Sequence, residues 1–353
     1  MAQANQSVAW FGDVGIADRP TVGGKGGSLG ELTQAGIAVP PGFVVTTHAF
    51  DLFLKALEAR EPVRPKVEAL DPSDIGAATK LSEQLRARVL EEAMPAEVEQ
   101  AIRSAHAELC PAAQPVAVRS SATTEDAEDA SFAGLQDTFL WVLDAEQMVA
   151  KVRECWGSLY STESMIYRRK QDFPEDGVAM AVVVQVMVDA RCAGVMFTRS
   201  PTTGDKSVIT IEGAWGLGSA VVSGEVTPDK WVLGKITGEI SARDISDKHI
   251  KQVQAEGGGI HDVELEGEER TSPCLTDEQL LALREVGRRV ERHYGKPQDI
   301  EWALDASGEV LILQARPETV WAMKDKERAA GKPVAEPQAN PLAHVMGIFG
   351  GKR

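Results

Sequence analysis

The sequence lacks the features of a disulfide-stapled protein, a membrane protein and a nucleic-acid-binding protein. Its 353 residues include four cysteines, none in a CxxC pair or beside a histidine at zinc-ligand spacing, so we expect reduced thiols. No run of about 18 apolar residues occurs, and the N-terminus has no basic segment followed by an apolar one. Positive charge is scarce, since 37 Lys and Arg stand against 53 Asp and Glu. The sequence therefore predicts a cytoplasmic protein with no membrane or nucleic-acid partner.

Several common catalytic motifs are missing as well. The chain contains no GxSxG, no HExxH, no Walker A loop and no GxGxxG followed by a ribose-binding acid. Its six histidines are scattered, with no neighbouring nucleophile and no metal-ligand spacing. We therefore look for function in less common arrangements of glycine, arginine and acidic residues.

What the sequence does contain predicts an α+β fold with two or three subdomains. Glycine-punctuated apolar runs over residues 7–50 predict strand, loop, helix and strand, and residues 51–110 predict a helical insertion. The run VAMAVVVQVMV at 178–188 predicts a strand buried on both faces. Further strands are predicted at 116–122, 193–199 and 207–215, followed by a helix at 276–295 opened by Thr276. DIEWALD and EVLILQARP predict a final strand pair.

GGKGGSLGEL places Lys25 among four glycines just before an apolar helix. Glycines allow the backbone to approach an anion, and a helix start offers free N–H groups. Lys25 is thus a candidate phosphate ligand. The alternative is a tight turn with a solvated lysine.

VRSSATTEDA ends a short apolar strand with Arg119. A buried arginine needs a partner, and its planar fork suits phosphate or carboxylate. The alternative to a phosphate contact is a buried arginine–carboxylate pair.

The final strand pair carries polar residues on an apolar surface: Glu301 on the first strand, and Gln314 and Arg316 two residues apart on the second. A carboxylate beside an amide oxygen makes a hard site for Mg²⁺, and the arginine can neutralise phosphate. The alternative is a structural cross-strand Glu–Arg pair.

The glycine-rich stretch EGAWGLGSAVVSGEVTPDKW adds three weaker candidates. Glu212, Ser219 and Asp229 are candidate ribose or metal contacts, with solvated loop positions as the alternative for each.

Five motifs then occur in the order found in the ATP-binding region of phosphoenolpyruvate synthases, which is similar to that of pyruvate phosphate dikinases and rifampicin phosphotransferases. They are GGKGGSLGEL with PPGFVVTTHAF, VAVRSSATTEDAEDASFAGLQDTFL, AGVMFTRSPTTG, EGAWGLGSAVVSG, and DIEWALD with LILQARP. The resemblance spans about residues 10 to 320. At Ser219 the chain departs from the family, which usually has a glutamate after GLG.

The resemblance implies an ATP-grasp-like fold that holds ATP and Mg²⁺ between two lobes, residues 1–185 and 186–321, followed by a tail or docking linker at 322–353. By motif matching, Lys25 and Arg119 would contact the triphosphate, with Arg316 on phosphate. Glu301 and Gln314 would hold Mg²⁺. Gln185 and Met187 would lie on the hinge strand that meets the adenine.

The resemblance also implies a partner. Full-length relatives continue into a domain with a phosphorylatable histidine in a TSHAA-like motif, and none of the histidines here lies in such a motif. We expect transfer of the β-phosphoryl of ATP to a histidine on a partner subunit, with the small-molecule acceptor bound elsewhere. The layout is similar to that of the phenylphosphate synthases of phenol degradation. The alternatives are a truncated or split phosphoenolpyruvate synthase or rifampicin phosphotransferase, and a non-catalytic ATP-sensing subunit.

Overall fold

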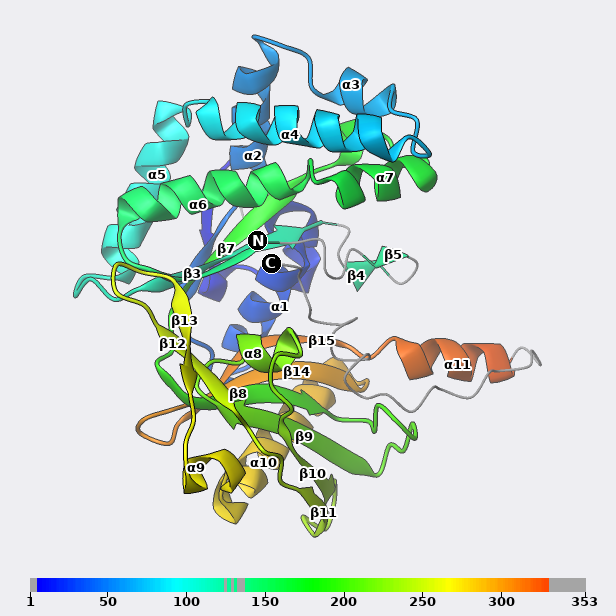
Figure 1. The fold of residues 1–353 in the computed structure, drawn as a ribbon. Coiled ribbons are helices and arrows are strands. Elements are labelled where there is room, and N and C mark those ends of the chain that lie inside the picture. The colour runs from blue at the N-terminus through cyan, green and yellow to red at the C-terminus, as the bar shows by residue number, and fades with distance from the viewer. Residues whose placement is uncertain (1–4, 124–125, 128–129, 132–136, 330–353) are drawn as a thin grey trace.

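The computed structural model describes residues 5–123, 126–127, 130–131 and 137–329. Within these residues the chain is a mixed α+β structure with two large antiparallel sheets, one in each half of the molecule (Figure 1). Strands between residues 8 and 186 build the first sheet, and strands between residues 190 and 317 build the second. The expected α+β class is confirmed.

The first sheet has five strands in the order β1-β2-β7-β3-β6. Their bounds are β1 Val8–Trp10, β2 Gly42–Val45, β3 Val116–Ala122, β6 Thr138–Val142 and β7 Met180–Val186. Central strand β7 is covered on both faces, as its continuous apolar run predicted. Val182 and Val184 enter the core beneath the helical layer, while Ala181 and Val183 enter a second core on the opposite face.

Six helices form a layer over the outer face of this sheet (Figure 1): α2 Thr47–Glu58, α3 Arg64–Glu68, α4 Ile75–Glu91, α5 Ala96–Leu109, α6 Ala145–Ser158 and α7 Thr162–Lys170. Polar N-caps begin several of them, because Asp74, Asp144 and Ser161 each accept a hydrogen bond from the backbone three residues later. Apolar stripes bury the other side, with Trp156 packed at 4.9 Å between ring centroids against Phe53.

Helix α1 (Arg19–Gln34) covers the inner face of the first sheet and contacts strands of both sheets. Two short 3₁₀ turns, Phe11–Asp13 and Ile16–Asp18, lead into it. The helix is broken at Gly23, whose φ is 70°. A side chain there would lie 2.1 Å from the carbonyl oxygen of Ser121, so only glycine allows this approach to β3.

The second sheet has six strands in the order β11-β10-β9-β8-β14-β15. Their bounds are β8 Ala190–Phe197, β9 Val208–Trp215, β10 Asp229–Gly234, β11 Ile240–Asp244, β14 Gln298–Asp305 and β15 Val310–Pro317. Helix α10 (Asp277–Tyr294) packs its apolar stripe on the outer face of this sheet. Thr276 caps it as predicted, and the reciprocal bond of the capping box comes from Gln279.

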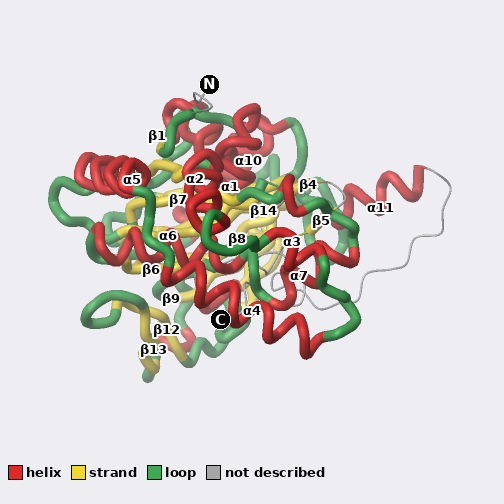
Figure 2. The backbone as a smooth tube through the Cα atoms, turned by 90° about the horizontal axis from the view of Figure 1, so that it is seen from above, coloured by secondary structure: helices red, strands yellow, loops and turns green. Residues whose placement is uncertain are grey.

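Several smaller elements complete the described fold. They are β4 Asp126–Ala127, β5 Ala130–Ser131, the 3₁₀ turn Glu175–Gly177, α8 Ser219–Val222, α9 Glu268–Thr271 and the hairpin of β12 Ile250–Gln254 and β13 Ile260–Glu264. Figure 2 shows this hairpin at the periphery of the molecule near β6 and β9. At its tip the N–H of Gly259 donates to the carbonyl oxygen of Trp141 at 3.1 Å, which ties the hairpin to the first sheet.

Helix α11 (Val320–Ala329) includes residues 322–329, the first part of the expected tail. Arg199 of the second half donates two hydrogen bonds to Asp325 at 2.9 and 3.1 Å. The indole N–H of Trp321 donates to the carbonyl oxygen of Pro201. The helix is thus anchored, and the remainder of the expected linker, residues 330–353, lies outside the described residues. None of the described helices has the length and apolarity to cross a membrane.

Candidate functional site

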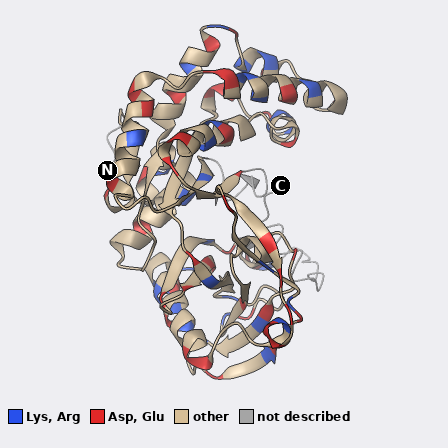
Figure 3. Ribbon diagram, turned by 60° about the vertical axis from the view of Figure 1, so that its left-hand side comes forward, with Lys and Arg blue, Asp and Glu red and all other residues tan. Residues whose placement is uncertain are grey.

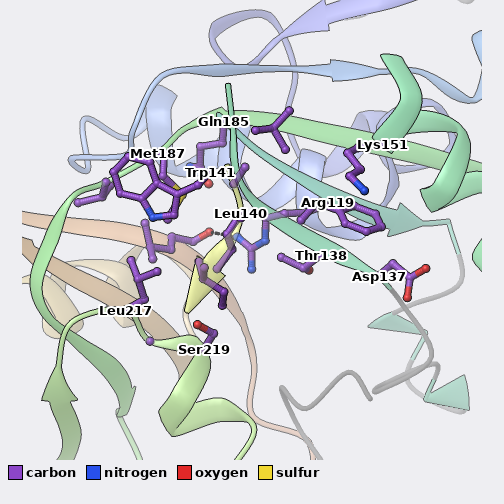
Figure 4. Close-up of a pocket in the computed structure, with 18 of the residues that line it drawn as sticks. Arg119, Asp137, Thr138, Leu140, Trp141, Lys151, Gln185, Met187, Leu217 and Ser219 are labelled. Atoms are coloured by element: carbon purple, nitrogen blue, oxygen red, sulfur yellow. Dashed lines mark hydrogen bonds between the residues drawn. The ribbon is translucent and has the colours of Figure 1, made fainter. Parts of the chain in front are cut away.

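A cavity of about 970 Å³ lies between the two sheets. Its lining comes from α1, β3, α4, β6, β7 and α6 on one side, and from β8, α8, β14, β15 and the hairpin tip on the other. A cavity of this size between two lobes is typical of a small-molecule or cofactor site. Figure 4 shows Trp141, Gln185 and Met187 at one end and Lys151 and Asp137 at the other.

The two ends differ in chemistry. Basic and acidic residues are interspersed over both halves of the molecule (Figure 3). Within the described lining, four cationic residues face three carboxylates: Lys25, Arg86, Arg119 and Lys151 against Asp137, Glu154 and Glu301. Burial raises the pKa of the Asp137 carboxyl, and the charge of Arg86 opposes that rise. The part of the cavity lined by these four cations suits a polyanionic ligand group.

Arg119 joins the two sheets across the cavity. From β3 its guanidinium donates to Glu301 Oε2 at 2.8 Å, to Gln314 Oε1 at 2.9 Å and to the carbonyl oxygen of Leu313 at 2.8 Å. The arginine is 8 % exposed. The structure therefore brings Arg119 together with Glu301 and Gln314, which were proposed from the final strand pair. It also contains a buried arginine–carboxylate pair, which was the alternative interpretation of Arg119.

A β-bulge in β15 makes this arrangement possible. Glu301 pairs with Gln314 and Trp302 pairs with Ile312, so Leu313 is an extra residue in its strand. Bulges redirect side chains and free backbone groups from the ladder. As a result Leu313 and Gln314 both line the cavity although they are adjacent in sequence.

Lys25 lies where α1 restarts after its break at Gly23. It is 8 % exposed and lines the cavity. The neighbouring backbone is fixed to β3, since the N–H of Gly26 donates to Ser121 Oγ and that hydroxyl donates to the carbonyl oxygen of Val22. The interrupted helix thus holds the lysine at a helix start on the cavity wall, the geometry that favours anion binding.

Gln185 and Met187 lie at the other end of the cavity, on and just after β7. The side-chain amide nitrogen of Gln185 donates to the carbonyl oxygen of Pro40 at 3.3 Å. The backbone N–H of Met187 donates to the carbonyl oxygen of Pro115 at 2.9 Å. This segment is therefore a rigid wall of the cavity.

Three candidates do not line the cavity: Glu212, Arg316 and Asp229. Glu212 is buried in β9 and forms an ion pair with Lys230 at 3.1 Å. Arg316 lies opposite Asp299 in the ladder, two residues beyond Gln314. Of the three weaker candidates, Glu212, Ser219 and Asp229, Ser219 alone lines the cavity. Asp229 is fully buried and accepts hydrogen bonds from Lys248 and from the backbone N–H groups of Ser246 and Cys274, so in the described structure it holds neighbouring segments of the chain.

Sequence reasoning missed several residues near the site. Trp141, Thr138, Asp137 and Lys151 line the cavity, but strand and helix patterns carried no functional signal for them. For Asp299 the sequence did contain an indication: it lies two residues before Glu301 in β14, so the two carboxylates share one face of the strand. It is 2 % exposed, and burial raises the pKa of its carboxyl to about 7 while the charge of Arg316 opposes the rise.

The donor atoms fit a hard divalent ion held together with phosphates. Glu301 Oε2 and Gln314 Oε1 converge on one atom, Nη2 of Arg119. The described residues contain no group of three or more His, Cys, Asp or Glu side chains placed for a metal. One or two protein oxygens completed by phosphate and water are how Mg²⁺ is usually bound in nucleotide sites.

The fold and the cavity define an α+β protein of two antiparallel sheets with a pocket between them that is lined by several cationic residues. Residues 19–336 match the family described as "Pyruvate phosphate dikinase, AMP/ATP-binding domain". Because the match covers most of the chain, the protein belongs to this family.

Relatives with assigned names are similar over nearly the whole chain. The chain is 43% identical over 316 residues to a probable phosphoenolpyruvate synthase of Methanothermobacter thermautotrophicus, covering 88% of this chain and 46% of the relative. It is 37% identical over 359 aligned positions to the phosphoenolpyruvate synthase of Pyrococcus furiosus, covering 90% and 44%. It is 42% identical over 311 residues to a rifampicin phosphotransferase of a Streptomyces species, covering 87% and 35%. The chain thus spans less than half the length of these relatives.

Proposed function

We propose that the chain is the Mg-ATP-binding, phosphoryl-donating unit of a dikinase-type phosphotransferase, with an ATP-grasp-like arrangement that holds the nucleotide between its lobes. One observation carries the proposal. Arg119 of the first lobe meets Glu301 and Gln314 of the second inside a cavity of about 970 Å³. In a member of this family, that convergence is the expected surrounding of a triphosphate.

The proposed roles follow from position. Lys25 and Arg119 contact the triphosphate. Arg316 shares a strand face with Gln314 and is proposed as a further phosphate contact, although it does not itself line the cavity. Gln185 and Met187 form the wall that meets the adenine. Glu212 has no role in this proposal, because it is buried and forms an ion pair with Lys230.

Glu301 and Gln314 would hold Mg²⁺, which when bound neutralises charge on the phosphates. In the described structure both oxygens accept hydrogen bonds from Arg119. Ligand binding therefore requires Arg119 to give up or share these contacts. Phosphate oxygens are suitable new acceptors for a guanidinium group.

The proposed reaction passes the β-phosphoryl of ATP to a histidine on a partner subunit and then to a small molecule. Overall, ATP, water and the acceptor yield AMP, inorganic phosphate and the phosphorylated acceptor. No histidine is among the described residues that line the cavity. This supports a histidine supplied by another domain or subunit.

The acceptor is the most specific part of the proposal. We propose phenol, as in phenylphosphate synthases. Pyruvate and rifampicin are the second candidates, because the similar proteins are named phosphoenolpyruvate synthase and rifampicin phosphotransferase.

The test separates binding from turnover. The isolated chain should bind Mg-ATP by calorimetry and gain thermal stability from it. It should form AMP at an appreciable rate only when a phosphohistidine-bearing subunit is added, with phenol, pyruvate or rifampicin as parallel acceptors. Rapid AMP formation from the chain and an acceptor alone would refute the partner requirement, and absence of Mg-ATP binding would refute the proposed function itself.

A further inference from the structure

The base-side wall of the cavity contains a tryptophan in an unusual backbone conformation. Trp141 has a φ of 54°, one of three positive values among described non-glycine residues. In the ladder between β3 and β6, Val116 pairs with Val142 and Val118 with Phe139, so Leu140 and Trp141 together oppose a single residue. This is a bulge, and left-handed bulge positions are usually glycine. A strained bulky residue beside a ligand cavity points to function.

Packing from the second lobe holds this conformation. The hairpin tip reaches Trp141, whose carbonyl oxygen accepts from the N–H of Gly259 at 3.1 Å. Gly258 has a φ of +100°, and a Cβ there would lie 2.9 Å from the same oxygen. The approach therefore needs a glycine at 258. The tip fixes the backbone of Trp141 and thereby its side chain.

The indole N–H of Trp141 is available as a hydrogen-bond donor. Trp141 lines the cavity, is 7 % exposed and has an Nε1 with no hydrogen-bond partner among the described residues. Trp231 and Trp302 also have unpartnered indole nitrogens, but both side chains are 0 % exposed and pack within the second core, although Trp302 is also among the residues that line the cavity. A buried donor without an acceptor is costly unless a ligand supplies one.

Position identifies which part of the ligand this donor would meet. Val116 of β3 pairs with Val142 on one side and Val186 on the other, so Trp141 and Met187 lie at the same end of the sheet. Figure 4 shows them at that end of the cavity. Arg119 and its partner Thr138 lie three residues further along β3, about 10 Å away at the usual strand rise.

We propose that Trp141 recognises the base of the bound nucleotide, its indole N–H donating to a ring nitrogen of the purine while the hairpin tip holds it in place. This inference rests on the proposed function, because it assumes that the cavity binds ATP. The phosphates would occupy the end near Arg119, and the two ends would be recognised independently.

The test compares Mg-ATP with magnesium tripolyphosphate, which has the phosphates and no base. Trp141→Phe keeps an aromatic ring and removes the donor. It should weaken Mg-ATP binding about three- to tenfold by calorimetry and leave tripolyphosphate binding unchanged. Trp231→Phe, which removes an unpartnered donor from the core away from the cavity, should change neither affinity.

A second pair of variants tests the hairpin without altering the indole. Gly258→Ala should weaken Mg-ATP selectively, because its methyl group would press on the Trp141 carbonyl. Gly308→Ala is the control, since its φ of +89° is equally unfavourable for alanine but no atom lies within 4 Å of the added carbon.

The outcomes separate the two proposals. Unchanged Mg-ATP affinity in folded Trp141→Phe and Gly258→Ala would overturn the base-recognition proposal. Equal weakening of Mg-ATP and tripolyphosphate would also overturn it, by showing a general structural role. If the wild-type chain bound neither ligand, the proposed function would fail before this inference was tested.

Discussion

Replacing Arg119 by lysine tests the convergence on which the proposed function depends. The guanidinium makes three hydrogen bonds of 2.8 to 2.9 Å to two strands of the opposite sheet. A lysine keeps the charge but cannot span the three acceptors. Hydrogen bonds to charged groups are worth about 1.5–3 kcal/mol each, so losing two of them should cost at least about 3 kcal/mol.

That loss should be visible in thermal unfolding. At about 2.1 cal/mol/K of unfolding entropy per residue, a chain of this length loses about 1 °C of melting temperature per 0.7 kcal/mol. Arg119→Lys should therefore melt about 4 °C lower. If Arg119 also contacts the triphosphate, the Kd for Mg-ATP measured by calorimetry should rise about 10- to 150-fold, the equivalent of one charge-assisted contact.

Arg168 provides a matched control. It is 1 % exposed and donates to Glu175 at 2.9 and 3.2 Å and to the carbonyl oxygen of Leu159 at 2.7 Å, away from the cavity. Arg168→Lys should lower the melting temperature comparably and leave the Mg-ATP affinity unchanged. A folded Arg119→Lys with the affinity of the wild type would show that Arg119 is only a structural link between the lobes.

Three further predictions follow from individual residues. Glu301→Gln should abolish most of the Mg²⁺-dependence of ATP affinity and reduce phosphoryl transfer to the partner histidine by orders of magnitude. Glu92→Gln, which changes a buried carboxylate elsewhere in the chain, is the control. A Mg²⁺ response of Glu301→Gln equal to that of the wild type would place the metal elsewhere. The raised pKa of Asp299, about 7 against about 3.9 unfolded, means that the folded state retains a proton which the unfolded state releases, so stability should fall as pH rises through this window. Asp299→Asn cannot ionise, and its loss of stability between about pH 5 and about pH 8 should be about 3 kcal/mol smaller than that of the wild type, whereas parallel denaturation curves would contradict the assigned pKa. Asp229→Asn leaves Lys248, 0 % exposed, without its carboxylate and should cost about 3–5 kcal/mol in denaturant unfolding. Asp247→Asn, at the exposed pair of Arg270 and Asp247, should cost far less, and equal losses of stability would refute this argument.

Local pattern was sufficient for much of the architecture. The continuous apolar run of β7 predicted a strand covered on both faces, and Thr276 predicted the start of α10. Both depend on interactions close in sequence or on burial periodicity, which the chain itself displays. The conformation of residues 322–329 was not predicted, because α11 is held by Arg199 and Pro201 more than 100 residues away.

For the candidate site, the sequence by itself indicated the kinds of residue to which we assign the chemistry: a glycine-flanked lysine, a strand arginine, and a carboxylate and an amide on paired strands. Their convergence was decided only by the tertiary structure, because it joins strands more than 180 residues apart in sequence. Two bulges complete the arrangement, one that directs Leu313 and Gln314 into the cavity and one that directs Leu140 and Trp141 there. A bulge shifts the register of a pleated strand by one residue, so strict alternation along the sequence cannot reveal which neighbours share a face.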